Sequence, residues 1–167
     1  LGRLNDKKKG LIYALKAMVL IIKEIPDAKL YLVSSDGKNQ ELINTINQYK
    51  LRNNVIFVSF TPNVTKYFLD SSVFFFTSLT EAFPMALNEA KAYGLPCVTF
   101  DVSYSVPYQS GVIKVEHFDY KGLAREVVKL LRDYNYRIKM GMEAKLSLNK
   151  FKSKIGRAVQ QECRDRY

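Results

Sequence analysis

The chain has 167 residues, and its 26 lysines and arginines against 16 aspartates and glutamates give a formal net charge of +10 at pH 7. Apolar residues make up 47% and charged residues 25%, which excludes an intrinsically disordered chain and suits one folded domain over residues 1–167. The sequence shows no apolar run long enough to cross a bilayer, no signal peptide and no disulfide framework, since Cys97 and Cys163 are its only cysteines. We therefore expect a cytoplasmic protein.

The positive charge fits an anionic partner, which can be nucleic acid, a phosphorylated ligand or an acidic membrane surface. Lys7-Lys8-Lys9 is a tight basic run whose default interpretation is a solvated loop. Basic and aromatic residues are not interleaved as nucleic-acid recognition requires, so nucleic acid is not an expected partner.

Short apolar runs alternate along the chain with segments of helical spacing. The sequence predicts, in order, helix Leu11–Lys23, strand Lys29–Ser34, helix Glu41–Tyr49 capped by Asn39, strands Val55–Phe60 and Val73–Phe76, helix Pro84–Tyr93 ended by Gly94, strands Cys97–Phe100 and Val112–Val115, and helices Leu123–Arg132, Arg137–Leu146 and Phe151–Cys163. Strands apolar on both sides, alternating with helices, predict an α/β fold: a Rossmann-like, doubly wound parallel sheet flanked by helices.

The first four residues read Leu1-Gly2-Arg3-Leu4, which has the pattern of a loop that follows a strand. The residues of that strand are mostly absent from the sequence. We therefore expect the chain to be a fragment of a longer protein.

Two loops are placed to bind a ligand, because open α/β sheets bind ligands at the carboxyl ends of their strands. In the first loop, Gly2 allows a sharp turn, and Arg3 and Lys9 precede the N-terminus of helix Leu11–Lys23. Two cations beside the unpaired N–H groups of a helix N-terminus form a phosphate site. Taken alone this pattern is common.

The second loop, Thr77–Glu89, places Glu81 between a strand and a helix and Glu89 inside that helix. Met85, Glu89 and Ala92 share one helical face, so the Glu89 carboxylate is expected in an apolar stripe. A buried carboxylate needs hydrogen-bond donors, which sugar hydroxyls supply. For either glutamate alone, a salt bridge or a half-exposed side chain is the favoured interpretation; their occurrence together with the Arg3 and Lys9 loop reverses that preference.

These motifs together resemble the C-terminal, nucleotide-sugar-binding half of GT-B glycosyltransferases of family 4. The resemblance rests on Gly2-Arg3-Leu4, Lys9-Gly10, Asn54–Val58, Ser78–Pro84, Glu89-Ala90 and Gly94–Val98, in the family's order and spacing up to about Gly141. The Glu81 and Glu89 pair is similar to the Glu-x7-Glu motif of the retaining enzymes.

The resemblance implies roles for individual residues. Arg3 and Lys9 would hold the donor's diphosphate, Glu81 the hydroxyls of the transferred sugar, and Glu89 the ribose hydroxyls. Gly2 belongs to the same donor-binding loops, and backbone N–H groups of Ala82 and Phe83 would approach the sugar and phosphates. The nucleobase would lie near the loop after Val55–Phe60.

The implied reaction is transfer of a sugar from a UDP- or GDP-sugar, with retention and with no metal or other cofactor. Arg3, Lys9 and the N-terminus of helix Pro84–Tyr93 would stabilise the departing diphosphate. The resemblance also implies an acceptor-binding N-terminal domain that is missing here, a saccharide or lipid-linked saccharide as acceptor, and an anionic membrane surface at the inner face of the membrane. The fragment alone would bind donor weakly and transfer nothing.

The sequence departs from the family at two loops: Ser35-Asp36-Gly37 replaces a Gly-x-Gly motif, and Val102–Ser110 lacks the expected glycines and glutamate. Elsewhere we expect Asp119 to be a helix cap, His117 to be structural and Cys97 to be a buried apolar residue. Two other functions remain open: a GT-B-related nucleotide-sugar epimerase, and a basic α/β module that binds anionic partners without catalysis.

Overall fold

A computed structural model describes residues 4–34, 39–59, 61, 63–81, 84–102 and 110–148. Its elements in chain order are a 3₁₀ turn η1 (Lys7–Lys9), α1 (Leu11–Glu24), β1 (Leu30–Val33), α2 (Gln40–Gln48), β2 (Val55–Val58), α3 (Thr65–Asp70), β3 (Phe74–Phe76), α4 (Met85–Ala92), β4 (Cys97–Phe100), β5 (Val112–Val115) and α5 (Tyr120–Arg132). Residues 134–148 are helical, with one break from α5 at residue 133.

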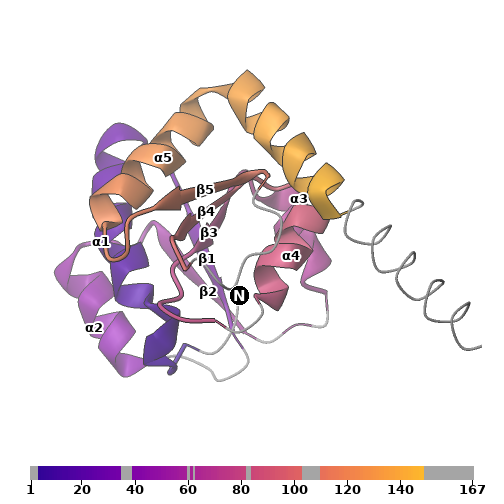
Figure 1. Cartoon of the computed structure of the whole chain (residues 1–167). Coiled ribbons are helices and arrows are strands. Elements are labelled where there is room, and N and C mark those ends of the chain that lie inside the picture. Colours follow the sequence, from indigo (N-terminus) through magenta and orange to yellow (C-terminus); the bar gives the residue numbers. More distant parts are fainter. Residues whose placement is uncertain are drawn as a thin grey trace, which may run out of the picture.

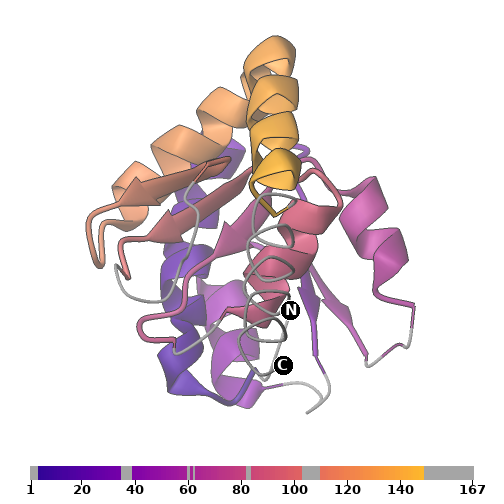
Figure 2. The same cartoon turned by 45° about the vertical axis from the view of Figure 1, so that its right-hand side comes forward.

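All described strands run parallel, and helices cover both sides of them. The hydrogen bonds divide the strands into a pair, β1-β2, and a group of three in the order β3-β4-β5. Helices α1, α2 and α5 lie on one side of the strands and α3 and α4 on the other (Figure 1; Figure 2). This arrangement confirms the predicted Rossmann-like α/β fold, although the sheet is divided into two parts.

The core lies between α1, α5 and the central strands. Helix α1 buries one stripe that includes Leu15, Met18 and Ile21, as its helical spacing predicted, and β4 is buried along its whole length. Leu15 and Phe100 have no exposed surface. Burying a side chain of this size stabilises the fold by about 1.5–3 kcal/mol, so these apolar contacts hold α1 against the sheet.

The two predicted helix caps are confirmed. The Asn39 side-chain oxygen accepts a hydrogen bond from the backbone N–H of Leu42 at 3.1 Å. The Asp119 carboxylate accepts one from the N–H of Gly122 at 2.8 Å, and α5 therefore begins at Tyr120, three residues earlier than its apolar spacing indicated. Each cap satisfies a backbone donor that would otherwise lack a partner in the first helical turn.

Two short elements were not predicted. The basic run Lys7–Lys9 forms a 3₁₀ turn, because the Asp6 carboxylate accepts a hydrogen bond from the N–H of Lys8 at 3.0 Å. Helix α3 has six residues and buries only Phe68, whose ring stacks on Tyr93 at a centroid distance of 5.2 Å. Six residues with one buried position give no recognisable period, so α3 depends on a contact distant in sequence.

Smaller differences concern the ends of elements. The strand predicted to end at Phe60 ends at Val58, and the helix predicted from Pro84 begins at Met85, with Pro84 at its cap position. The predicted helix Phe151–Cys163 lies outside the described residues. Within the described ranges, no helix combines the length and the apolar character that crossing a membrane requires.

Candidate functional site

The segment Leu4–Gly10 forms hydrogen bonds with residues that follow the carboxyl ends of β1 and β3. On the β1 side, the Asn39 side-chain amide donates to the carbonyl oxygen of Leu4 at 3.3 Å. On the β3 side, the N–H of Leu79 donates to the carbonyl of Lys8 at 2.7 Å, and the Thr77 hydroxyl donates to the carbonyl of Lys9 at 2.9 Å. These bonds fix the backbone of Lys9 beside the loop that follows β3, at the edge where α/β sheets bind ligands.

Gly10 makes this close approach possible. Its φ is +60°, and a Cβ atom at this position would lie 2.2 Å from the carbonyl oxygen of Thr77. Only glycine combines a positive φ with no side chain, so the residue lets η1 end and α1 begin directly against the loop after β3. The glycine therefore determines where the Lys9 side chain starts.

Lys9 and Glu81 meet at this edge. The Lys9 ammonium nitrogen lies 2.5 Å from a carboxylate oxygen of Glu81, although the two residues are 72 positions apart in sequence. Their side chains are 28% and 16% exposed, so the pair is mostly covered but open to solvent on one side. An ammonium group has three donor hydrogens and a carboxylate two acceptor oxygens, so both keep hydrogen-bonding capacity for a ligand.

Glu89 lies in the middle of α4 and is half-buried. Among the residues that the structure describes, none forms an ion pair with its carboxylate. The prediction that Glu89 lies in a buried apolar stripe with Met85 and Ala92 is wrong, because Met85 is 60% exposed and Ala92 is exposed as well. Helix α4 instead turns Leu87, Ala90 and Lys91 toward β3 and β4, which leaves Glu89 at the boundary of the core.

Several predicted site residues lie outside the described residues. These are Gly2, Arg3, Ala82 and Phe83, together with the loop Ser35-Asp36-Gly37 and most of the segment Val102–Ser110. Of the four predicted functional side chains, the structure therefore describes three, brings Lys9 and Glu81 together, and places Glu89 on the helix that follows the Glu81 loop.

Three buried polar residues close to this edge or on α4 were not predicted. Thr77 and Ser78 directly follow β3 and are 4% and 1% exposed, and Lys91 on α4 has no exposed surface. Burial lowers the pKa of Lys91 below its ordinary value. Lys91 follows Leu87 by four positions and Ala90 by one, so the helical spacing of α4 contained a signal for its burial.

Two further predictions, a buried Cys97 and a structural His117, concern side chains that pack in the fold. Cys97 is fully buried, as predicted, and burial raises the pKa of its thiol to about 12. The ring of His117 stacks on Phe118 at a centroid distance of 4.1 Å and lies 5.7 Å from Phe100. These contacts agree with a structural role for His117.

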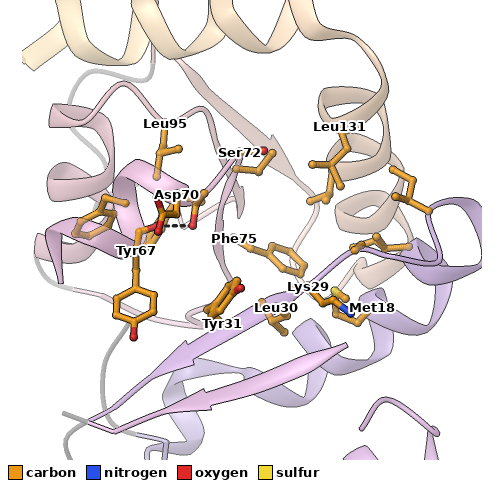
Figure 3. Close-up of a pocket in the computed structure, with 18 of the residues that line it drawn as sticks. Met18, Lys29, Leu30, Tyr31, Tyr67, Asp70, Ser72, Phe75, Leu95 and Leu131 are labelled. Atoms are coloured by element: carbon orange, nitrogen blue, oxygen red, sulfur yellow. Dashed lines mark hydrogen bonds between the residues drawn. The ribbon is translucent and has the colours of Figure 1, made fainter. Parts of the chain in front are cut away.

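A cavity in the described structure lies away from this polar edge. It has a volume of about 500 Å³ and is lined by β1, β3 and the helices around them (Figure 3). Neither Lys9, Glu81 nor Glu89 contributes to its lining, which is mainly apolar. Size alone therefore does not identify the polar site at the carboxyl ends of the strands.

Comparisons with known proteins point to one family. The family model described as "Glycosyl transferases group 1" matches residues 1–147. The chain is 31% identical over 140 residues to poly(glycerol-phosphate) alpha-glucosyltransferase of Bacillus subtilis, which covers 81% of this chain and 21% of that protein. It is 34% identical over 93 residues to an amylovoran biosynthesis glycosyltransferase of Erwinia amylovora, which covers 49% of this chain and 26% of that protein.

A solved structure shares the fold. Anabaena HepE, crystallised in complex with UDP and glucose, matches 95% of this chain and 47% of its own length with a TM-score of 0.78 and 18% identity. The chain thus spans about a fifth to a quarter of the length of the two curated relatives and about half of HepE.

Proposed function

The chain belongs to the glycosyl transferases group 1 family, and we propose that it is the donor-binding domain of a retaining glycosyltransferase that uses a nucleoside diphosphate sugar. The observation that carries the proposal is the contact of Lys9 with Glu81 at the carboxyl ends of the strands. It joins a cation suited to phosphate and an acid suited to sugar hydroxyls within one small site. The UDP and glucose bound to the related HepE support this class of donor.

In this proposal Lys9 and Arg3 bind the diphosphate of the donor. Glu81 accepts hydrogen bonds from the transferred sugar, and Glu89 accepts them from the ribose. The backbone of Gly2, Ala82 and Phe83 completes the donor site. The Lys9–Glu81 ion pair holds both side chains at the site before the donor arrives, and their unused hydrogen-bonding groups then bind the phosphate and the sugar.

Sugar transfer breaks the bond between the anomeric carbon and the diphosphate, so negative charge develops on the leaving group. Lys9 and Arg3 stabilise that charge where it develops, together with the N-terminus of α4. We propose that no metal ion takes part. The acceptor hydroxyl enters on the face that the diphosphate leaves, which gives retention without a carboxylate nucleophile.

The full enzyme has a second domain in this proposal. Family members that match the chain are two or more times its length, so we propose that the acceptor is bound by a domain outside residues 1–167. We propose a surface polysaccharide or a lipid-linked saccharide as the acceptor and the cytoplasm as the place of synthesis; the biosynthesis of amylovoran named for one relative supports the polysaccharide. The isolated fragment would then bind donor weakly without transferring sugar.

One surface feature favours attachment to an anionic membrane. Helix 134–148 exposes a row of apolar side chains one turn apart: Tyr134, Ile138, Met142 and Leu146, which are 65%, 39%, 62% and 59% exposed. Lys139 and Lys145 are exposed on the same side of this helix, as helical geometry places them. An apolar row flanked by lysines is typical of helices that lie in the surface of a membrane.

Vesicle binding by the full-length protein tests this attachment. Ile138→Asp is expected to weaken binding to phosphatidylglycerol vesicles, because it places a negative charge in the apolar row. Ile12 on α1 has a similar exposure of 37%, so Ile12→Asp is a matched control and should leave binding unchanged. Equal loss in both variants, or no loss in either, would contradict membrane contact through this helix.

Calorimetric titration and product analysis with the full-length protein test the proposed function. We expect one nucleoside diphosphate, UDP or GDP, to bind more tightly than the other and to keep most of its affinity when salt is raised. A basic module without a specific site would bind polyphosphate as well as either nucleotide, and salt would abolish that binding. Conversion of a nucleotide sugar to its epimer without an acceptor would instead identify an epimerase.

A further inference from the structure

A stacked pair of rings lies in the loop between β5 and α5. The rings of His117 and Phe118 are nearly parallel, with an interplanar angle of 10° and a centroid distance of 4.1 Å. Phe100, the last residue of β4, contacts both: its ring centroid lies 5.7 Å from that of His117 and 6.4 Å from that of Phe118. Because Phe100 has no exposed surface, it attaches the pair to the core.

The first turn of α1 supports the same pair. The ring of Tyr13 lies 5.5 Å from that of Phe118 and meets the ring of Phe100 edge to face at 5.6 Å. The N–H of Tyr13 donates to the carbonyl of Gly10 at 2.9 Å, so this support begins at the glycine that ends η1. Contacts from α1 and β4 therefore fix the rings of Tyr13, His117 and Phe118, which we call the aromatic cluster.

Phe118 is exposed although it is a large apolar residue. It is 51% exposed, and His117 beside it is exposed as well. The φ of Phe118 is +67°, which is an outlier for a bulky residue. Its carbonyl accepts a hydrogen bond from the N–H of Tyr120 at 2.9 Å, so the first residue of α5 helps to hold this conformation. Residues kept in strained conformations are concentrated at ligand-binding sites.

Two carboxylates lie at the same edge. Phe100 of β4 pairs with Val115 of β5, and Asp101 and Glu116 are the residues that follow them. The Asp101 side chain is 51% exposed, and one of its oxygens accepts a hydrogen bond from the Lys114 ammonium group at 2.9 Å. Glu116 is exposed, and among the described residues none forms an ion pair with it. Both carboxylates thus keep hydrogen-bond acceptors for a ligand.

An aromatic ring beside carboxylates has the chemistry to bind a neutral saccharide. A sugar ring has an apolar face of C–H bonds that can pack on an aromatic ring, and its hydroxyl groups can donate to carboxylates. Asp101 and Glu116 disfavour a phosphorylated ligand or an anionic membrane surface at this position, because like charges repel.

The aromatic cluster lies to one side of the proposed donor site. Strand β4 separates β5 from β3, and the β1-β2 pair lies on the other side of β3 (Figure 1). Neighbouring strands are about 4.8 Å apart, so the carboxyl end of β5 lies about 10 Å from that of β3. A disaccharide can span this distance. The nucleobase is expected near the end of β2, on the opposite side.

We propose that the aromatic cluster, together with Asp101 and Glu116, is a binding subsite for a neutral saccharide, with Phe118 as the stacking residue. It holds a sugar of the acceptor chain that lies about two residues from the reacting hydroxyl. The acceptor role rests on the proposed function, whereas saccharide binding itself does not. The subsite therefore favours acceptors of three or more sugar residues.

Calorimetric titration of the full-length protein with neutral oligosaccharides tests the inference. The probes are oligomers of glucose, galactose and N-acetylglucosamine with one to four residues, and UDP and GDP are titrated separately. We expect at least one trimer or tetramer to bind more tightly than its monosaccharide. Phe118→Asn should weaken that binding by about tenfold, because the apolar contact is lost, whereas Phe118→Tyr should retain it. Asparagine tolerates a positive φ, so the first variant should keep the fold.

Tyr93→Asn is the matched control. Tyr93 is 41% exposed and its ring also stacks on a neighbour, Phe68, but it lies between α4 and the start of β4, at the opposite edge of the sheet. This substitution should leave saccharide binding unchanged. Glu116→Gln changes only an exposed side chain and should weaken binding by about threefold, because a hydrogen bond to a charged acceptor becomes one to a neutral acceptor. It keeps the inference testable if Phe118→Asn does not fold.

The nucleotide titrations separate failure of the subsite from failure of the donor site. If UDP or GDP binds, the subsite is refuted by any of three results: no oligomer binds, Phe118→Asn and Glu116→Gln bind as the wild type, or Tyr93→Asn loses as much affinity as Phe118→Asn. A changed nucleotide affinity in Phe118→Asn would mean that the ring contacts the donor instead. Saccharide binding that depends on Phe118, without binding of either nucleotide, would refute the acceptor role together with the proposed function.

Discussion

Lys91 and Cys97 interact electrostatically in the core of the chain, at the amino end of β4. Burial lowers the pKa of the Lys91 ammonium, and burial raises the pKa of the Cys97 thiol to about 12. Glu81 follows the carboxyl end of β3, the opposite end of the sheet. The two shifts therefore affect stability as a function of pH and do not belong to the proposed donor site.

Cys97 should make the chain sensitive to alkali. Its thiol has a pKa of 9.0 when exposed and about 12 in the fold, so its stabilising contribution is complete below pH 9 and is lost between pH 9 and 12. Lys91, whose pKa is lowered, acts in the opposite direction as the pH approaches 10.5. Urea unfolding of the wild type and of Cys97→Ala at pH 8 and pH 11 separates the two, because both proteins keep Lys91.

We expect the wild type to lose stability relative to Cys97→Ala by about 1.4 kcal/mol per pH unit within this window. A constant difference between the two proteins from pH 8 to pH 11 would show that Cys97 is not buried as a neutral thiol. Below pH 9 the difference should not depend on pH.

At the scale of elements, local pattern predicted most of the fold. Strands β4 and β5 were predicted with their observed bounds, since each is a short apolar run between turn residues. Helix α3 could not be predicted, because Phe68 is held by Tyr93 from beyond β3. The buried face of α4 was predicted wrongly, because the strands against which it packs decide which of its faces is buried.

The predicted site followed from a rule of topology, which places the carboxyl ends of parallel strands at one edge. That rule brought Lys9 and Glu81 to the same edge although they are 72 positions apart in sequence. It contained no information on their direct contact, which depends on the turn at Gly10 and on the bonds from Thr77 and Leu79. The sequence thus predicted the location of the site and not its geometry.

Gly10→Ala should destabilise the fold and displace Lys9. The new Cβ would meet the Thr77 carbonyl oxygen in a residue with a positive φ, so the expected loss of unfolding free energy exceeds about 2 kcal/mol. Gly94 is a matched control: its φ is +76°, but the nearest atom to a new Cβ lies 3.8 Å away, so Gly94→Ala should cost only about 1 kcal/mol. Chemical denaturation measures both, and equal losses would contradict the close approach at Gly10.

For the whole molecule, the structure separates two kinds of site. A polar site lies at the carboxyl ends of the strands, and an apolar cavity lies between the two sheets. The proposed nucleotide-sugar donor needs cations and hydrogen-bond acceptors and not an apolar cavity. The polar edge therefore remains the candidate for donor binding in the full-length protein.

Removal of metal ions tests the proposal that sugar transfer needs no metal ion. If Lys9 and Arg3 alone neutralise the leaving diphosphate, incubation with EDTA should leave the rate of sugar transfer by the full-length protein unchanged. Loss of activity with EDTA that returns with Mg²⁺ or Mn²⁺ would show that a metal ion shares this role.

The most direct measurement of the central claim is calorimetric titration of the full-length protein with its nucleoside diphosphate, comparing Lys9→Ala with Lys7→Ala. Both variants remove one positive charge from the same 3₁₀ turn, but the Lys7 side chain is exposed and only Lys9 contacts Glu81. We predict a loss of affinity of about tenfold or more for Lys9→Ala, the usual value of a charge-assisted hydrogen bond, and less than about twofold for Lys7→Ala. Equal effects of the two substitutions, or unchanged affinity in Lys9→Ala, would contradict a donor site built on Lys9 and Glu81.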